Sequence, residues 1–239
     1  MIKTLIVIPV RMKSTRLPGK PLIKIRGKTM IERVWHNAKK ADVGDVYVAC
    51  CDKEIEDVLK KKKISYIFTK KNAKSGTDRV YDAFSKIKNK SKYNVVINLQ
   101  GDLPYFNPLY LKKLLALTTV NNFQIGTLVN PIINKKKIFD NNIVKVAISN
   151  YKKNVYKAIY FSRLPIPYNA DKFYEHIGVY AYKPSILKKF VEFKQTKLEK
   201  FESLEQLRAL ENQINIFASS VSKAPISIDT KNDLKNLLK

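Results

Sequence analysis

Short runs of apolar, mostly β-branched residues alternate with apolar residues at helical spacing along the first half of the chain. Four of the runs predict buried strands, at residues 5–10, 45–50, 64–68 and 93–99. Apolar residues three and four positions apart predict the intervening and following helices, at residues 30–40, 54–62, 80–87 and 107–117. Strands and helices that alternate in this way build parallel sheets covered by helices. We therefore expect an α/β sheet in this half.

The pattern changes from residue 124 onward, where strands follow one another without helices between them. The strands predicted here are residues 125–133, 143–149, 155–161 and 176–182. Asparagine-containing turns separate the first three. We expect a β-rich insertion at about residues 124–182, with antiparallel pairing and a subunit contact. No internal repeat or flexible linker interrupts the sequence, so residues 1–239 are expected to form one domain.

The end of the chain returns to mixed elements. Two helices are predicted at residues 184–193 and 198–210, and two strands at residues 214–218 and 226–228. Thr230 is expected to cap a terminal helix, with Asp233 three residues further on.

The loop after the first predicted strand is cationic. It carries four positively charged side chains, Arg11, Lys13, Arg16 and Lys20. In an α/β sheet this loop lies at the carboxyl edge, where ligands bind, and four cations there suit a polyanion of phosphate size. The loop lacks the glycine spacings of the Walker A motif and of the dinucleotide-binding fingerprint. A solvated basic loop in a lysine-rich chain is the alternative interpretation.

Two carboxylates come directly after predicted strands. Asp102 follows the strand at residues 93–99, beside Gly101, and Asp229 follows the short strand near the C-terminus. Mg²⁺ prefers one or two such carboxylates together with phosphate oxygens, so both aspartates are candidate ligands. Each could instead serve local structure, Asp102 in a turn and Asp229 beside a helix cap.

Weaker signals come from a turn and from the two histidines. The Ser-Gly-Thr turn at residues 75–77 precedes a predicted helix, and its main-chain N–H groups could bind an anion or a base edge. Every helix needs a cap, however, so this turn is a modest signal. His36 is expected to be structural, and a lone histidine such as His176 is more often a hydrogen-bonding residue than a catalyst.

Composition places the chain among globular proteins. Its 239 residues, 45% of them hydrophobic, suffice to bury a core. No apolar run is long enough to span a membrane, and we expect the first residues to form a strand rather than a signal peptide. Cys50 and Cys51 are adjacent, rarely a disulfide pair and too few for a zinc site. We expect reduced cysteines and a cytoplasmic protein with no membrane partner.

The charge raises nucleic acid as a partner. The formal net charge is +26, from 46 Lys and Arg against 20 Asp and Glu. The lysines are spread along the whole chain, however, and no arginine-rich tail, zinc-finger spacing or RNP-like aromatic motif is present. Nucleic-acid binding is therefore the weaker hypothesis, although the charge would concentrate phosphate-bearing ligands near the surface.

Seven motifs occur in the order and register of one family. They are Arg-x-x-Ser-Thr-Arg-Leu-Pro-Gly-Lys-Pro-Leu at residues 11–22, Ser-Gly-Thr-Asp-Arg at 75–79, Gln-Gly-Asp at 100–102, Tyr-Phe-Ser-Arg-x-x-Ile-Pro at 160–167, His-Ile-Gly-Val-Tyr at 176–180, Leu-Glu-Gln-Leu-Arg at 204–208 and Ile-Asp-Thr-x-x-Asp-Leu at 228–234. Over essentially its full length the chain resembles the 3-deoxy-D-manno-octulosonate (Kdo) cytidylyltransferases, also called CMP-Kdo synthetases. Related CMP-sialic acid synthetases share the fold and the first loop but differ at the later motifs.

The resemblance implies a reaction and an architecture. The cytidylyl group of CTP would pass to Kdo, with release of pyrophosphate, for lipopolysaccharide synthesis. The implied protein is a cytoplasmic homodimer that uses Mg²⁺. Its implied fold is the Rossmann-like nucleotidyltransferase fold, a mixed, mostly parallel sheet flanked by helices with a β-rich dimerisation excursion. We see no covalent nucleophile with a paired base, which fits direct transfer.

Site roles follow from the resemblance by motif position. The residues implied to hold CTP are Arg11, Arg16, Lys20, Ser75, Gly76 and Arg79. The residues implied to line the sugar-acid pocket are Gln100, Arg163, His176, Tyr180, Glu205 and Gln206. Asp102 and Asp229 would carry Mg²⁺, and together with Arg11 and Lys20 they form the implied catalytic set. Cations and metal suit this reaction because its transition state loads negative charge onto phosphate oxygens.

Two departures from the family pattern bear on the sugar. Leu103 stands where the family usually has a glutamate, and Cys50-Cys51 replaces an acidic or threonine-rich turn. The alternative substrate is therefore another ulosonic acid, such as an amino-substituted Kdo or a sialic-acid-like sugar. The rival from another class is a basic nucleic-acid-binding protein. Cytidylyl transfer requires Asp102 and Asp229 to converge on one cation, near the cationic loop.

Overall fold

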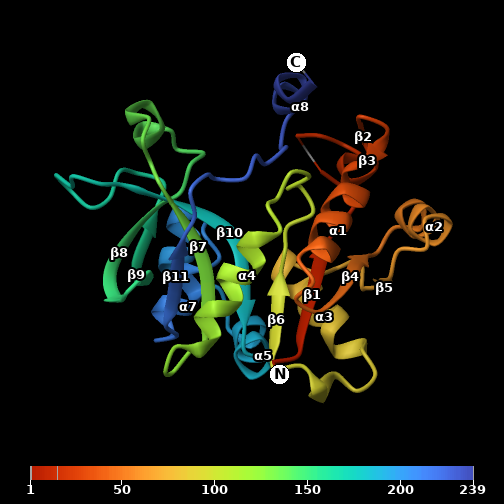
Figure 1. The fold of residues 1–239 in the computed structure, drawn as a ribbon, viewed down its shortest axis with the longest axis horizontal. Helices are drawn as coiled ribbons and strands as arrows, with labels where there is room; N and C mark the ends of the chain where they lie inside the picture. The colour runs from red at the N-terminus through yellow and green to blue at the C-terminus, as the bar shows by residue number, and fades with distance from the viewer. Residues whose placement is uncertain (1, 15, 239) are drawn as a thin grey trace. The chain divides into compact units, whose positions relative to one another are not determined.

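The computed structural model describes residues 2–14 and 16–238 (Figure 1). The chain forms two compact units, one of Met1–Lys112 with Pro225–Lys239 and one of Lys113–Ala224. The C-terminal segment therefore belongs to the same unit as the N-terminal strand. In the part of the chain that the structure describes, no helix combines the length and apolar character needed to cross a bilayer.

Four strands of the first unit run parallel to one another, in the order β5, β4, β1, β6. Their bounds are β1 Thr4–Pro9, β4 Asp45–Cys50, β5 Tyr66–Phe68 and β6 Val95–Asn98. β1 pairs with both β4 and β6, and all of its residues are buried, as in a sheet covered on both faces. The parallel α/β sheet predicted for the first half of the chain is confirmed.

Helices and short turns connect these strands. The helices are α1 Met30–Lys40, α2 Lys53–Lys61, α3 Gly76–Lys86, α4 Leu109–Ala116 and α8 Lys231–Leu238; the shorter elements are η1 Lys20–Leu22, β2 Lys24–Ile25, β3 Lys28–Thr29 and η2 Lys90–Lys92. The capping box expected at the start of α1 is present, because the Thr29 N–H donates to the Glu32 carboxylate at 2.8 Å and Thr29 Oγ1 accepts from the Glu32 N–H at 3.4 Å. Each predicted helix of this half exists, with ends shifted by a few residues.

An apolar cluster holds the C-terminal segment to the first unit. Its buried members are Leu17, Ile25, Met30 and Ile228, and the partly buried residues packed against them are Ile23, Leu234 and Leu237. Full burial of one such side chain stabilises the fold by roughly 1.5–3 kcal/mol. The cluster thus joins α8 to the loop after β1 and to the start of α1.

The second unit is rich in strands, which lie in the order β10, β7, β11, β9, β8. Their bounds are β7 Ile125–Pro131, β8 Lys145–Lys152, β9 Val155–Ser162, β10 Tyr174–Tyr182 and β11 Ile216–Ser220. β7 and β11 are parallel, whereas the remaining pairs are antiparallel, including a contact of β8 with β10. The strands predicted between residues 124 and 218 are present, with shifted ends. The predicted class, a mixed α/β sheet flanked by helices, is confirmed. The expectation that the sheet is mostly parallel is wrong, because the strand pairs of the second unit are antiparallel apart from that of β7 with β11.

The single helix predicted at residues 198–210 is wrong. The structure has two short helices, α6 Lys197–Glu202 and α7 Leu207–Glu211, in addition to α5 Pro184–Glu192 and the 3₁₀ turns η3 Leu117–Thr119 and η4 Lys135–Phe139. Ser203 adopts the left-handed conformation, with φ 53°, and the Leu204 N–H reaches back to the Glu199 carbonyl at 3.1 Å. This bonding pattern ends helices, and it usually needs a glycine, which the sequence lacks here.

The short strand predicted before Asp229 is also wrong. Residues 226–228 are irregular, and the Ile228 N–H donates to the Asp102 carbonyl at 3.1 Å. The prediction for the cysteines holds, since Cys50 and Cys51 are buried and form no disulfide. Burial raises the pKa of the Cys50 thiol to about 12, so it stays protonated and unreactive.

Candidate active site

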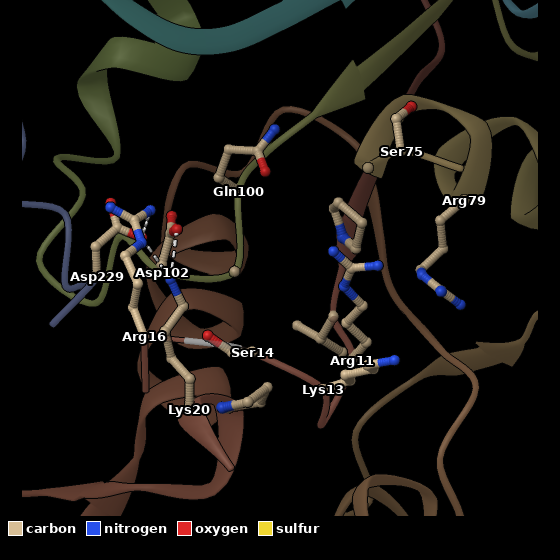
Figure 2. Close-up of a pocket in the computed structure, with 15 residues that line it drawn as sticks. Arg11, Lys13, Ser14, Arg16, Lys20, Ser75, Arg79, Gln100, Asp102 and Asp229 are labelled. Carbon is tan, nitrogen blue, oxygen red and sulfur yellow. Dashed lines mark hydrogen bonds and ion pairs between the residues drawn. The ribbon is translucent and has the colours of Figure 1, made fainter. Parts of the chain in front are cut away.

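A pocket of about 450 Å³ lies at the carboxyl ends of the parallel strands of the first unit (Figure 2). It is bounded by the loop after β1, the start of α3, the turn after β6 and the segment before α8. Every predicted site residue of the first unit lines it: Arg11, Arg16, Lys20, Ser75, Gly76, Arg79, Gln100, Asp102 and Asp229. Ligands bind at this edge in open α/β sheets, because the strand ends and helix N-termini converge there.

The cationic loop after β1 is fixed by main-chain bonds on both sides of Met12. The Met12 N–H donates to Asp52 Oδ2 at 2.8 Å, and its carbonyl accepts from the Gly19 N–H at 3.2 Å. Gly19 has a φ of 68°, a conformation that glycine adopts without steric cost. The loop therefore folds back on itself and presents Arg11 on one side and Lys20 on the other (Figure 2).

Lys20 joins the two candidate metal ligands. Its Nζ lies 2.8 Å from Asp102 Oδ2 and 2.9 Å from Asp229 Oδ1, and Arg16 lies 3.2 Å from the same Asp229 oxygen. Burial alone would lower the pKa of Lys20, but the charges and hydrogen bonds of the two aspartates raise it above its usual value. The convergence that the sequence required is present.

A glycine allows the turn with Asp102 to approach β1. A Cβ atom on Gly101 would lie 2.5 Å from Val10 Cγ1 and 3.0 Å from the Pro9 carbonyl oxygen. Any larger residue would force the turn away from the strand. Gly101 is therefore the residue that lets Asp102 reach Lys20.

Asp229 is placed by the chain on either side of it. The Ile228 N–H bonds to the Asp102 carbonyl, which ties the two carboxylate-bearing segments together. On the other side Thr230 and Asp233 cap α8: the Thr230 hydroxyl donates to the Asp233 carboxylate at 2.9 Å and accepts from the Asp233 N–H at 3.2 Å. The predicted cap is confirmed.

The start of α3 forms another side of the pocket (Figure 2). Ser75 caps the helix, since its hydroxyl accepts from the Asp78 N–H at 3.1 Å. The buried Arg79 donates from one amino group to Thr69 Oγ1 at 2.6 Å and to the Lys70 carbonyl at 3.1 Å. These bonds order the connection into α3, and the N-terminal end of a helix favours an anion.

Gln100 also lines the pocket, and its Nε2 donates to Asn98 Oδ1 at 3.2 Å. Figure 2 shows Lys20 and the two aspartates gathered on one side of the view and Arg79 with Ser75 on the other. One side of the cavity thus holds two carboxylates paired with Lys20 and Arg16, and the other side holds Arg79. Carboxylates suit a metal ion and arginines suit phosphate oxygens.

The remaining residues predicted for the sugar acid lie in the second unit. The Arg163 guanidinium donates to three main-chain carbonyls, those of Glu202 at 3.0 Å, Asn141 at 3.0 Å and Ser203 at 3.5 Å. The Arg163 N–H donates to the Glu202 carboxylate at 2.9 Å. A guanidinium has five N–H groups, so two are left over for a carboxylate.

His176 is held as a neutral ring. Burial lowers its pKa to about 3, and Phe161 and Tyr180 lie against it, with ring centroids 4.9 and 5.4 Å away. The Thr127 hydroxyl lies 3.0 Å from the Val179 carbonyl and 3.1 Å from His176 Nε2. Because the hydroxyl has one proton, which it donates to a carbonyl, it accepts from Nε2–H, and Nδ1 carries the lone pair.

Tyr180 lies against the His176 ring, and the charge of Glu205 acts on Tyr180. Burial raises the pKa of Tyr180 well above its usual value, with the charges of Tyr182 and Glu205 adding to it. Gln206 is only 7% exposed, and no hydrogen-bond partner for its Nε2 occurs in the described residues. A buried amide donor without a partner is costly, so it suits a ligand oxygen.

The sequence interpretation missed two supporting residues. Asp52 anchors the loop after β1, and it follows β4 at the same carboxyl edge that identified Asp102, so the same rule could have found it. Lys145 is fully buried and donates to the carbonyls of Asp140, Ile143 and Arg163. A lysine in a β-strand pattern carries no signal of this role.

Comparison with known proteins decides the family. The sequence profile of the cytidylyltransferase family matches residues 5–216. The chain belongs to the cytidylyltransferase family. It is 42% identical to the 3-deoxy-manno-octulosonate cytidylyltransferase of Rickettsia prowazekii, over 98% of this chain and 93% of that protein. It is 39% identical to the enzyme of the same name from Paramagnetospirillum magneticum, over 97% of this chain and 94% of that protein.

Solved structures agree with this cytidylyltransferase assignment. The CMP:2-keto-3-deoxy-manno-octonic acid synthetase complexed with CTP is 33% identical to this cytidylyltransferase and has a TM-score of 0.91, covering 99% of this chain and 97% of that one. A cytidylyltransferase from Leptospira borgpetersenii, at 18% identity and a TM-score of 0.64, covers 100% of this chain and 86% of that one. The latter likeness concerns the fold alone.

Proposed function

We infer that this cytidylyltransferase transfers the cytidylyl group of CTP to Kdo, giving CMP-Kdo and pyrophosphate. The observation that carries the inference is the convergence of Asp102, Asp229 and Lys20 in a pocket of cations, in a chain more than 40% identical to a Kdo cytidylyltransferase over almost its whole length. The predicted family activity and this geometry point to the same chemistry.

The chain's own residues supply most of what cytidylyl transfer needs. The anomeric hydroxyl of the sugar attacks the α-phosphorus, the bond to the β-phosphate oxygen breaks, and pyrophosphate leaves. Arg11, Arg16, Lys20 and Arg79 line the pocket that would hold the triphosphate. Their charges and the N–H groups at the start of α3 stabilise the negative charge that builds on phosphate oxygens in the transition state.

Asp102 and Asp229 fit a divalent cation. One atom, Lys20 Nζ, lies within hydrogen-bond distance of an oxygen of each, so a single small cation can contact both. Mg²⁺ binds in this way, through one or two carboxylates and the phosphates of a substrate. We propose that these aspartates hold Mg²⁺, which when bound neutralises phosphate charge and polarises the α-phosphoryl group.

We propose that the sugar acid is read by hydrogen bonds. Arg163 has two N–H groups for the sugar carboxylate, and the neutral His176 has an acceptor at Nδ1. Gln206 offers an unpartnered donor, and Gln100, Tyr180 and Glu205 complete the set. Sites built to bond hydroxyl groups reject analogues that lack them by large factors, so selectivity among ulosonic acids should be sharp.

We propose a homodimer formed through the second unit. Large apolar side chains of this unit are exposed, namely Ile133, Phe139, Tyr151, Ile159, Leu164, Tyr168 and Phe201. Most come from the connections between β7 and β8 and between β9 and β10. Apolar side chains of this size and number favour coverage by a partner surface.

The proposed function is tested by assaying purified protein with CTP, Mg²⁺ and a panel of sugar acids. We expect pyrophosphate release and CMP-sugar formation with Kdo, with slower turnover for amino-substituted Kdo and for sialic acid. Asp102→Asn should lower kcat at least about a hundredfold, since loss of one transition-state charge contact costs about 3 kcal/mol. Asp57→Asn, an exposed aspartate of α2, is the matched control and should leave turnover unchanged.

Three results would correct or contradict this function. A preference for another ulosonic acid would keep cytidylyl transfer and correct the substrate. Unchanged turnover in Asp102→Asn would remove Asp102 from the site, and no CMP-sugar with any acid would refute the proposed activity.

A further inference from the structure

The ammonium of Lys20 occupies the place between the two carboxylates. Its Nζ bonds to Asp102 at 2.8 Å and to Asp229 at 2.9 Å, and the side chain is 16% exposed, less than either partner. Figure 2 shows the lysine reaching up from the loop after β1 with both bonds on its terminal nitrogen. A lysine that served only to attract phosphate would have its ammonium free in the pocket.

The charges at this point balance without a metal ion. Asp102 and Asp229 carry two negative charges, and Lys20 and Arg16 pair with them and carry two positive charges. A divalent cation that bound both aspartates would bring the same two positive charges to the same oxygens. The ammonium could not stay within hydrogen-bond distance of both oxygens at that moment, because like charges at contact repel strongly.

The aspartates also make an incomplete metal site on their own. Among the described residues, no cluster of three or more His, Cys, Asp and Glu side chains could hold a metal ion. Two carboxylates satisfy Mg²⁺ only when further oxygens come from water or from a phosphate ligand. The free protein thus offers few ligands to a divalent ion, and the Lys20 ammonium already lies between the two carboxylates.

We propose that Lys20 holds the place of the divalent ion in the free protein and exchanges with it when the ion arrives on CTP. The ammonium bridges the aspartates in the absence of nucleotide and excludes the ion. When metal-bound CTP enters, the aspartates turn to the ion, and the released ammonium serves the triphosphate. The inference rests on the proposed function, and it makes Lys20 a positioning residue as well as a phosphate ligand.

The exchange predicts how the affinity for a divalent ion depends on CTP. A divalent ion should bind the free protein weakly, because it must displace an ammonium that already satisfies both carboxylates. CTP should strengthen that binding by supplying phosphate oxygens to the ion and a new partner for the ammonium. Such coupling is reciprocal, so the ion should strengthen CTP binding by the same factor.

The test measures Mn²⁺ binding without nucleotide, by the electron paramagnetic resonance signal of free Mn²⁺. We expect Lys20→Met to bind Mn²⁺ at least about tenfold more tightly than the wild type, since the local competitor is gone. Lys20→Arg keeps a cation there and should bind as weakly as the wild type. Adding Asp102→Asn to Lys20→Met should abolish the gain.

A second lysine separates displacement from general charge effects. Lys13 lines the same pocket, and no ion pair of the described residues joins it to either aspartate. Lys13→Met loses the same single charge from the pocket but leaves the place between the aspartates filled. We expect it to change Mn²⁺ affinity by less than about threefold, because exposed charges act weakly at a distance.

Equal affinities of Lys13→Met and Lys20→Met would overturn the inference. Tight Mn²⁺ binding by the nucleotide-free wild type would also overturn it, if Asp102→Asn abolished that binding. This second measurement does not depend on the folding of a lysine variant. Circular dichroism checks that Lys20→Met is folded. Failure of the wild type to form CMP-Kdo would refute the proposed function separately. The comparison of Mn²⁺ affinities would still test whether Lys20 competes with the ion.

Discussion

Single residues differ between the two units in the charge state that their surroundings impose. In the first unit, Lys20 stays charged because the aspartates beside it outweigh the cost of its burial. In the second unit, burial keeps His176 and Tyr180 neutral. Charges suit phosphates, and neutral hydrogen-bonding groups suit sugar hydroxyls. The charge state of each side chain is therefore the one that its proposed role requires.

The neutral state of His176 predicts a pH dependence of stability. Its pKa is lowered to about 3, from 6.5 in the unfolded chain. Below pH 6.5 His176 is therefore protonated in the unfolded chain but stays neutral in the folded chain. The free energy of unfolding falls as the pH drops towards 3. The contribution of neutral His176 to the free energy of unfolding is complete above pH 6.5. Below pH 6.5 it decreases by up to about 1.4 kcal/mol per pH unit.

His176→Gln removes this proton uptake. Urea unfolding between about pH 6.5 and about pH 4 should show a shallower loss of stability in the variant than in the wild type. His36→Gln is the control, since His36 is only partly buried and its pKa is lowered less. Parallel stability curves for wild type and His176→Gln would show that His176 titrates normally in the folded protein.

Elements, rather than residues, determine which parts of the fold local sequence could predict. Strands such as β1 and helices such as α1 carry their own signal, an apolar run or a capping box. The break at Ser203 carries none, because a left-handed serine resembles any other serine in the sequence. The irregular segment before Asp229 has an apolar pattern that tertiary contacts with Leu17 and Met30 satisfy, not strand pairing.

The residues of the first-unit pocket were predictable where one rule about loops at the sheet edge applies to them. The rule that loops after parallel strands share one edge led to Arg11, Lys20 and Asp102. Asp229 was selected by the same rule, as an aspartate after a short strand and beside a helix cap, but the structure has no strand before it. Roles in the second unit came only from the family resemblance. The carbonyls that Arg163 bonds belong to Asn141, Glu202 and Ser203, which are distant in sequence, and no local pattern records such contacts.

The element that holds the cationic loop yields a prediction for Asp52. This residue stands at the N-cap position of α2, yet its carboxylate makes no cap bond and instead accepts the Met12 N–H. Asp52→Ala should raise KM for CTP about tenfold with a smaller effect on kcat, since a hydrogen bond to a charged group contributes about 1.5–3 kcal/mol. KM for Kdo should not change.

Two variants make the Asp52 experiment specific. Asp52→Asn retains an acceptor oxygen and should recover most of the CTP affinity. Asp57→Ala removes an exposed carboxylate from the same helix, one that pairs only with Lys53 at 3.6 Å among the ion pairs described, and should leave KM unchanged. An equal rise in both KM values, or the same effect from Asp57→Ala, would show a general loss of structure instead of a loosened loop.

At the scale of the whole molecule, two opposing forces act on association. The second unit exposes large apolar side chains, which favour a dimer, while each chain carries a formal charge of +26, which disfavours it. Salt screens charge with a Debye length of about 10 Å at 0.1 M and weakens the repulsion without weakening apolar contacts. Association should therefore strengthen as salt rises, the reverse of what nucleic-acid binding would show.

Light scattering at a series of salt concentrations measures this balance. We expect a mass near twice the chain mass of 27.6 kDa at about 0.3 M KCl and a larger monomer fraction at about 0.02 M. Tyr168→Glu and Phe201→Glu should shift the protein to monomer at both concentrations, because each places a charge among exposed apolar groups of the second unit. Phe68→Glu, at an exposed apolar position of the first unit, should leave the mass unchanged. A monomer at every salt concentration would mean that the apolar surface serves another purpose, and a dimer that dissociates as salt rises would mean that ion pairs hold it.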